Sequence, residues 1–266
     1  MVEFFADLYR KQPLLTATAW IHVTLALVML LGLAVDNRSI LGLNPWIKPI
    51  KFAASIAVYL FTIALFISYL PQRHALLTWT AGVISATMLI EIALISMQAL
   101  RGTTSHFNTT TPFDTVVFAA MGIAVAINTV AVLFVIWQYF EQPPALSPAF
   151  LWGIRLGLVV FVLGSIQGFL MASRMGHTVG APDGGPGLPI LNWSTRFGDL
   201  RVAHFIGLHG LQLIPLVGYL VAGSAAPEKN APSSLLTVCA VAGISIGAML
   251  WAHLQALAGR PLINGR

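Results

Sequence analysis

Charged residues are scarce in this chain: Asp, Glu, Lys and Arg together make up 9% of its 266 residues. Soluble domains carry about 25% charged residues, so the composition excludes an ordinary soluble globular protein. Cysteine is nearly absent as well, since Cys239 stands alone. A single cysteine excludes a disulfide within the chain, a metal site built from several cysteines and a c-type haem attachment motif.

Apolar residues take the place of the missing charge. Hydrophobic residues make up 57% of the chain, and the mean hydropathy is +0.83. The net charge is +5, but the Lys and Arg residues are scattered singly through connecting segments. Membrane proteins collect positive charge in their loops, whereas nucleic-acid-binding proteins gather it in a patch or a basic helix. The sequence therefore indicates a polytopic membrane protein in contact with the lipid bilayer and no nucleic-acid partner.

Seven apolar segments are each long enough to cross the hydrocarbon core, which takes about 20 helical residues. The first of them exceeds the length of a signal-peptide core, about 7–15 residues, so we expect it to be a retained helix. We predict an all-α membrane protein in which residues 1–266 form a single transmembrane domain, one bundle of seven helices. The expected helices are 14–35, 50–70, 76–98, 113–140, 149–171, 200–222 and 234–257.

A long loop rich in Gly and Pro, residues 173–199, separates the fifth and sixth expected helices. Its GAPDGGPGLP stretch lacks the GK[ST] ending and the preceding strand of a phosphate-binding loop. Because successive helices alternate in direction, this loop shares one membrane side with the connections 36–49 and 99–112. We expect it to form a lid over polar groups on that side. Asp199, directly before the sixth helix, is expected to cap that helix.

Polar and ionisable side chains gather in the halves of the helices nearest to that side. At 1.5 Å per residue, Glu91 lies roughly 10 Å below its helix end, while His209 and Gln212 lie roughly 12 to 18 Å deep. Ionisable groups inside a membrane are costly and usually face an interior, a cavity or a partner. We therefore predict one polar layer. Its members are Glu91, Gln98, His106, Asn108, Gln167, Asp183, His204, His209, Gln212 and His253.

Glu91 is the candidate catalytic residue or metal ligand, since a carboxyl at this depth must be protonated, paired or metal-bound. His204 and His209 lie about 140° apart around their helix, so they cannot bind one ion together as an i, i+4 pair does. We expect His209 to join Glu91, and His204 to join His106 or His253. The same four histidines are candidates for holding haem b, whose axial ligation needs no sequence motif.

Small residues recur four positions apart in GIRLG (153–157), GSIQG (164–168) and GISIG (243–247). Such patterns allow two helices to approach closely. We expect them to pack helices within the bundle, and the alternative is a contact face in a homo-oligomer.

Three stretches, SHFN (105–108), APDGGPGLP (181–189) and GDLRVAHFIGLHGLQ (198–212), resemble, in the same order, a family of uncharacterised bacterial integral membrane proteins. The resemblance implies a multi-pass protein of the bacterial inner membrane. It implies no activity, cofactor or catalytic residue.

Three functions remain open at this point. The first is a redox protein with haem b or a transition metal ion, exchanging electrons with a quinone or a soluble partner; it accounts best for the abundance of histidine. The second is a metal-dependent hydrolase or another lipid-modifying enzyme, so whether the chain is an enzyme is left open. The third is a small-molecule transporter or sensor, in which Glu91, Asn128 and Arg155 mark a polar path.

Overall fold

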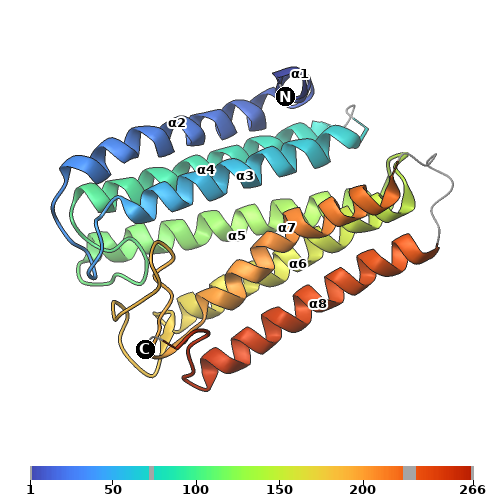
Figure 1. Cartoon of the computed structure of the whole chain (residues 1–266). Helices are drawn as coiled ribbons and strands as arrows, with labels where there is room; N and C mark the ends of the chain where they lie inside the picture. The colour runs from blue at the N-terminus through green and yellow to red at the C-terminus, as the bar shows by residue number, and fades with distance from the viewer. Residues whose placement is uncertain (1, 72–74, 224–231, 265–266) are drawn as a thin grey trace. The chain divides into compact units, whose positions relative to one another are not determined.

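The computed structural model describes residues 2–71, 75–223 and 232–264. In these ranges the chain forms eight α-helices and two short strands, and seven of the helices are long and apolar enough to cross a membrane (Figure 1). The prediction of an all-α, multi-pass membrane protein is confirmed. By its internal contacts the chain divides into unit 1, Met1–Val135, and unit 2, Ile136–Arg266. A single transmembrane domain stays a prediction.

The ends of the seven long helices lie close to the expected positions, because the length of an apolar run fixes where a membrane helix can end. The helices are α1 (Val2–Lys11), α2 (Pro13–Val35), α3 (Ile47–Tyr69), α4 (Ala75–Leu100), α5 (Pro112–Glu141), α6 (Pro148–Ser173), α7 (Arg201–Ala222) and α8 (Pro232–Leu257).

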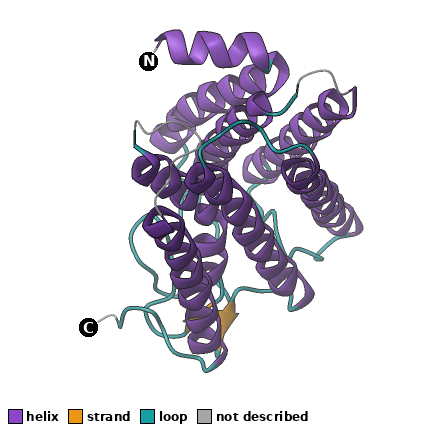
Figure 2. Cartoon of the chain, turned by 90° about the vertical axis from the view of Figure 1, so that its right-hand side faces the viewer, coloured by secondary structure: helices purple, strands orange, loops and turns teal. Residues whose placement is uncertain are grey.

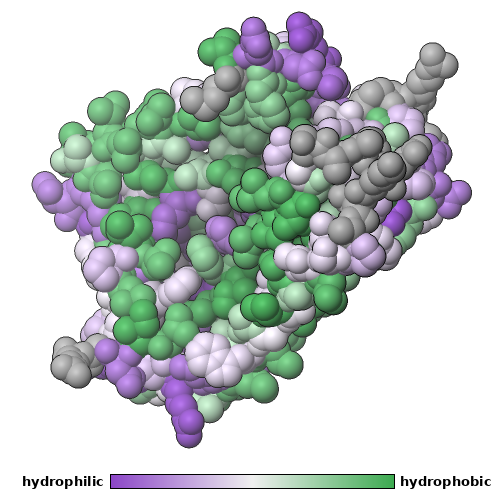
Figure 3. All heavy atoms as spheres, turned by 45° about the vertical axis from the view of Figure 1, so that its right-hand side comes forward, coloured by the Kyte–Doolittle hydropathy of each residue, from purple (hydrophilic) through white to green (hydrophobic). Residues whose placement is uncertain are grey.

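Unit 1 contains α1 to α4 and most of α5. Helices α2, α3 and α4 pack against one another around fully buried side chains such as Leu15, Leu60 and Ile84. The outward side chains are also apolar: Leu27 and Val116 are more than 60% exposed. Figure 3 shows broad hydrophobic areas on one face of the molecule, with hydrophilic residues mainly along its edges. This distribution is the one that a lipid environment requires.

Helix α1 is a separate element that was not among the expected helices. Pro13 begins α2 and has no backbone N–H to continue α1, so the chain turns there. Figure 2 shows α1 lying across the ends of the neighbouring helices of unit 1. The ring of Phe5 lies edge-on to Trp20 and Phe61, at centroid distances of 5.4 and 5.1 Å. An amphipathic helix placed in this way suits the membrane interface.

Unit 2 is built on a close contact between α6 and α7. A methyl group added to Gly207 would lie 2.5 Å from Cα of Gly164, and one added to Gly157 would lie 2.8 Å from the ring of Pro215. Only glycine allows the two backbones to approach this closely. The expected packing role of the first two small-residue patterns is therefore confirmed at these positions.

The third pattern, on α8, has a different setting. Methyl groups added to Gly243 and Gly247 would meet no atom within 4 Å. The homo-oligomer contact at this face stays a prediction.

The Gly/Pro-rich loop of unit 2 is folded back on itself. Strand β1 (Thr178–Val179) pairs in antiparallel fashion with β2 (Gly198–Asp199), and Thr178 lies opposite Asp199. Between the strands, Ile190 and Asn192 have left-handed backbones, with φ of 66° and 57°. Ile190 is 73% exposed. The pairing brings the start and the end of the loop together at the beginning of α7.

Candidate functional site

Unit 1 contains a buried carboxylate next to an imidazole. Glu91 of α4 is only 3% exposed, and its Oε1 lies 3.6 Å from Nε2 of His106. The second oxygen, Oε2, is buried and has no hydrogen-bond partner among the described residues. The hydroxyl oxygen of Ser105 lies 3.1 Å from Nδ1, the other ring nitrogen of His106. The loop after α4 therefore folds back to place an imidazole beside the carboxyl of its own helix.

A hydrogen-bonded network lies at the end of α4. Nε2 of Gln98 donates to Oδ1 of Asp114 at 2.8 Å, and Nη1 of Arg101 donates to the same oxygen at 2.6 Å. Thr111 donates its hydroxyl to the other carboxylate oxygen at 2.6 Å. Gln98 is fully buried, whereas the side chain of Arg101 is 38% exposed. The network thus connects the interior of unit 1 with its surface.

Four buried polar residues lie on one face of α4. Thr80, Thr87, Glu91 and Gln98 follow one another at spacings of seven, four and seven residues, and all are less than 9% exposed. At 100° per residue these spacings keep the side chains within about 40° of one another. The stretch from Thr80 to Gln98 is about 27 Å long, close to the hydrocarbon thickness of about 30 Å. This row is called the α4 stripe below.

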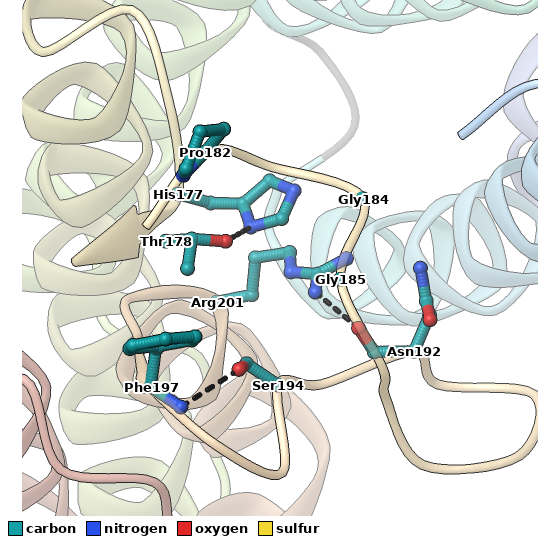
Figure 4. Close-up of a pocket in the computed structure, with 9 residues that line it drawn as sticks. All are labelled: His177, Thr178, Pro182, Gly184, Gly185, Asn192, Ser194, Phe197 and Arg201. Atoms are coloured by element: carbon teal, nitrogen blue, oxygen red, sulfur yellow. Dashed lines mark hydrogen bonds between the residues drawn. The ribbon is translucent and has the colours of Figure 1, made fainter. Parts of the chain in front are cut away.

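The loop of unit 2 places a histidine between two carboxylates. Nδ1 of His177 lies 3.3 Å from Oδ1 of Asp183 and 3.8 Å from Oδ1 of Asp199. The hydroxyl of Thr178 lies 3.2 Å from the same nitrogen. Figure 4 shows that the other ring nitrogen points toward the Gly184–Gly185 stretch, across a small pocket that the imidazole and Arg201 border.

Asp199 fastens this loop to α7. Its Oδ1 accepts the backbone N–H of Arg201, the first residue of α7, at 3.0 Å, so Asp199 satisfies this amide from the position before the N-cap residue, Leu200. Its Oδ2 accepts the backbone N–H of Ser194 at 2.8 Å. Nη2 of Arg201 donates to Asp199 and to the carbonyl of Asn192. Burial acts to raise the pKa of Asp199, but the hydrogen bonds and the charge of Arg201, together with the backbone N–H of Ser194 and the charge of His177, hold the pKa below its ordinary value.

The two histidines of α7 point in different directions, as their spacing predicts. Nδ1 of His204 lies 2.7 Å from the carbonyl oxygen of Gly164 on α6. His209 is exposed, and its ring stacks on Phe205 at a centroid distance of 3.8 Å. His204 therefore faces the interior of unit 2, and His209 faces its surface.

The remaining predicted members lie in separate surroundings. Gln167 donates to the carbonyl of Leu200 at 3.4 Å, and Gln212 is half-buried on α7. Asn108 organises its own loop: its Nδ2 donates to Oγ1 of Thr103 at 3.0 Å. Nδ1 of His253 is buried, and no residue that the structure describes makes a hydrogen bond with it.

Only part of the predicted pairing is formed. His106 lies beside Glu91, whereas it was expected beside His204. Within unit 2, no hydrogen bond joins His204 to His253 in the described part of the chain. The pairs His209 with Glu91 and His204 with His106 each join two separately described units, and they stay predictions. Among the described residues, no group of three or more His, Cys, Asp or Glu side chains is placed to hold a metal ion. The haem or metal centre stays a prediction.

Two residues of the expected polar path have local partners. Asn128 accepts a hydrogen bond from the hydroxyl of Tyr59 at 2.9 Å, within unit 1. Arg155 donates twice to the carbonyl of Tyr139, at 3.1 and 2.7 Å, and its guanidinium lies over Phe140. Arg155 therefore satisfies a carbonyl near the end of α5, and Asn128 takes part in a contact between α3 and α5.

The α4 stripe was not predicted, although the sequence contains its signal. Thr80 and Thr87 share the helical face of Glu91, and a search for polar residues on that one face would have found them. The ion pairs of His177 had no such signal, because they depend on how the loop folds.

No protein family, curated protein sequence or solved structure matches the chain in the comparisons made. The resemblance to bacterial membrane proteins stays a prediction from the three motifs.

Proposed function

We propose that the chain is a small-molecule transporter of the membrane and that Glu91 carries the proton that it exchanges. The observation that carries this proposal is the position of Glu91: a carboxyl that is 97% buried in a membrane-length helix, with one oxygen beside His106 and the other without a hydrogen-bond partner in the described part of the chain.

The chemistry of such a carboxyl supports the exchange of a proton. An ionised carboxylate inside the membrane costs several kcal/mol unless a positive charge lies beside it. Glu91 can avoid that cost by binding a proton itself, by facing a protonated His106 or through the positive charge of Lys48. Chains of Asp, Glu and His side chains relay protons in pumps and transporters for this reason. The free Oε2 remains open for a proton or a ligand.

The α4 stripe supports this proposal, because its buried polar side chains recur over a membrane-length stretch of the helix. Thr80 and Thr87 donate their hydroxyl hydrogens to carbonyls of their own helix, at 2.7 and 2.9 Å. Their oxygens therefore keep lone pairs that can accept a passing proton or cation. At the other end, Gln98 joins the network of Asp114 and Arg101, which reaches the surface.

Proton movement in sealed vesicles tests this function. The purified protein is reconstituted around a pH-sensitive dye, and organic amines, amino acids, sugars and carboxylates are added in turn. We expect one class of solute to change the internal pH of vesicles that contain the wild-type protein. In vesicles that contain Glu91→Gln, the same solute should change the internal pH no more than it does in vesicles without protein. Glu141→Gln, at the exposed end of α5, is the matched control and should behave as wild type. The proposal fails if no solute class gives a Glu91-dependent signal.

A further inference from the structure

Aromatic rings surround the imidazole that faces Glu91. The ring of His106 lies 5.6 Å from Phe52, 6.1 Å from Phe107 and 6.3 Å from Phe118. These rings come from α3, from the loop after α4 and from α5, all within unit 1. The face of an aromatic ring carries a partial negative charge and attracts cations. The carboxyl of Glu91 and these rings are therefore suited to a positive group with apolar substituents.

Lys48 provides an example of an ammonium group that contacts one of these rings. Its Nζ lies over the ring of Phe52, 5.6 Å from the centroid. Its charge also acts on Glu91. The ammonium group of Lys48 thus lies on the face of one ring of the cluster, Phe52, and contributes positive charge near the carboxyl of Glu91.

Apolar side chains next to these rings limit the kind of ligand. Ile95, one turn beyond Glu91, packs with Val117 and Met121, and Phe52 and Phe118 cover the same cluster. A metal ion prefers several oxygen, nitrogen or sulfur ligands. Among the described residues, no group of three such acidic, histidine or cysteine side chains is formed. An organic cation finds both of its requirements, one carboxylate and several ring faces.

We propose that Glu91 and the rings of Phe52, Phe107 and Phe118 bind a lipophilic organic monocation, such as an alkyl or aryl ammonium ion. This inference rests on the proposed function and names the class of its substrate. The exchange balances in charge: the carboxyl of Glu91 releases one proton to water and then pairs with one cation. Proton and cation therefore occupy the carboxyl of Glu91 in turn.

Tetraphenylphosphonium is a suitable probe, because it is a permanent cation and cannot carry a proton itself. Its binding to the full chain in detergent is measured by equilibrium dialysis, and the released protons are measured in weakly buffered solution. We expect release of about one proton for each bound cation in wild type. In Glu91→Gln the release should vanish and the affinity should fall at least about tenfold. Glu141→Gln should bind as wild type does.

Phe52 tests the aromatic contribution separately from the charge. Phe52→Leu should weaken binding about tenfold and still release a proton, while Phe52→Tyr keeps a ring and should retain the affinity. Phe66→Leu, at another buried position of α3, is the control for a general loss of packing. Lys48→Met should bind the probe about threefold more tightly, since the competing ammonium is removed. Equal affinities of wild type and Phe52→Leu would overturn the proposal.

An infrared measurement separates the two proposals. The carboxylic acid C=O band of the wild-type protein is compared between low and high pH. A band that is absent from Glu91→Gln belongs to Glu91, and its response to pH reports whether this carboxyl exchanges a proton. If this band responds to pH but the probe does not bind, the organic cation is excluded and the proposed function stands. If the band does not respond to pH, both proposals fail.

Discussion

Nδ1 of His177 lies 3.3 Å from Oδ1 of Asp183, and this contact joins the first turn of the Gly/Pro-rich loop to its middle. The backbone N–H of Thr178 donates to the same oxygen at 2.8 Å. With Asp199 and Arg201 at the other end, the loop is held by two carboxylates that come from different parts of it. The loop is therefore an ordered part of unit 2 whose stability depends on ionic groups, of which Asp199 is buried and the others are half-buried.

We predict that Asp199→Ala loosens this loop. The substitution leaves the N–H of Ser194 without its acceptor and the guanidinium of Arg201 without its carboxylate. Removing one partner of a buried ion pair costs about 3–5 kcal/mol. Hydrogen exchange of the backbone amides in residues 177–199, followed by mass spectrometry, should become much faster. Asp183→Ala is the comparison, with a smaller effect, because its side chain is 20% exposed. Unchanged exchange in Asp199→Ala would contradict the assigned role.

The pH dependence of the same loop follows from the pKa of Asp199. Because the folded-state pKa lies below the unfolded value, ordinarily about 3.9, the ionised carboxylate contributes stability above that value. The contribution is lost as the pH falls below about 4 and through the folded pKa. Exchange in residues 177–199, corrected for the intrinsic pH effect, should stay slow from neutral pH to about pH 5 and rise below pH 4. Asp199→Asn should remove this acid-dependent step.

Close contact between α6 and α7 makes a second stability prediction. A methyl group on Gly164 would lie 2.7 Å from the backbone of Gly207, so Gly164→Ala forces the helices apart. Overpacking of this kind costs about 1–3 kcal/mol. Thermal unfolding of the detergent-purified variant should occur at a clearly lower temperature. Gly247→Ala, where the added methyl meets open space, should unfold as wild type does. If both variants unfold at the same temperature as the wild-type protein, α6 and α7 are not in this contact.

The haem or metal hypothesis has its own measurement. It predicts a Soret band in the purified protein that shifts on reduction with dithionite, or a stoichiometric metal ion by elemental analysis. The expected ligands His204 and His209 point to different sides of α7, so His204→Ala and His209→Ala should then differ in their effect. A colourless protein without bound metal would exclude this hypothesis.

The fold was predictable where the membrane alone dictates it. The ends of α2 and α6 lie within two residues of the expected ones, because an apolar run of a given length has one way to cross a bilayer. Helix α1 escaped prediction, since ten residues that lie at an interface leave no long apolar run. The depth of Glu91 was also predictable, because depth is counted along one helix.

The partners of the site residues were harder to predict. Sequence spacing gives the direction of His204 relative to His209, but it does not show which neighbouring helix each one meets. His106 faces Glu91 because its own loop folds back, and that depends on contacts of unit 1 that no local pattern encodes. The same holds for His177 and Asp183.

The left-handed backbone of Ile190 has a practical consequence. A β-branched residue in this conformation costs about 1–2 kcal/mol, so the surrounding turn has to be fully folded before the residue is held in that way. Its side chain is at the same time well exposed. The tip of the loop is therefore a conformational epitope: an antibody fragment raised against it should recognise native protein and fail on denatured chains, which makes it a reporter of correct folding during purification.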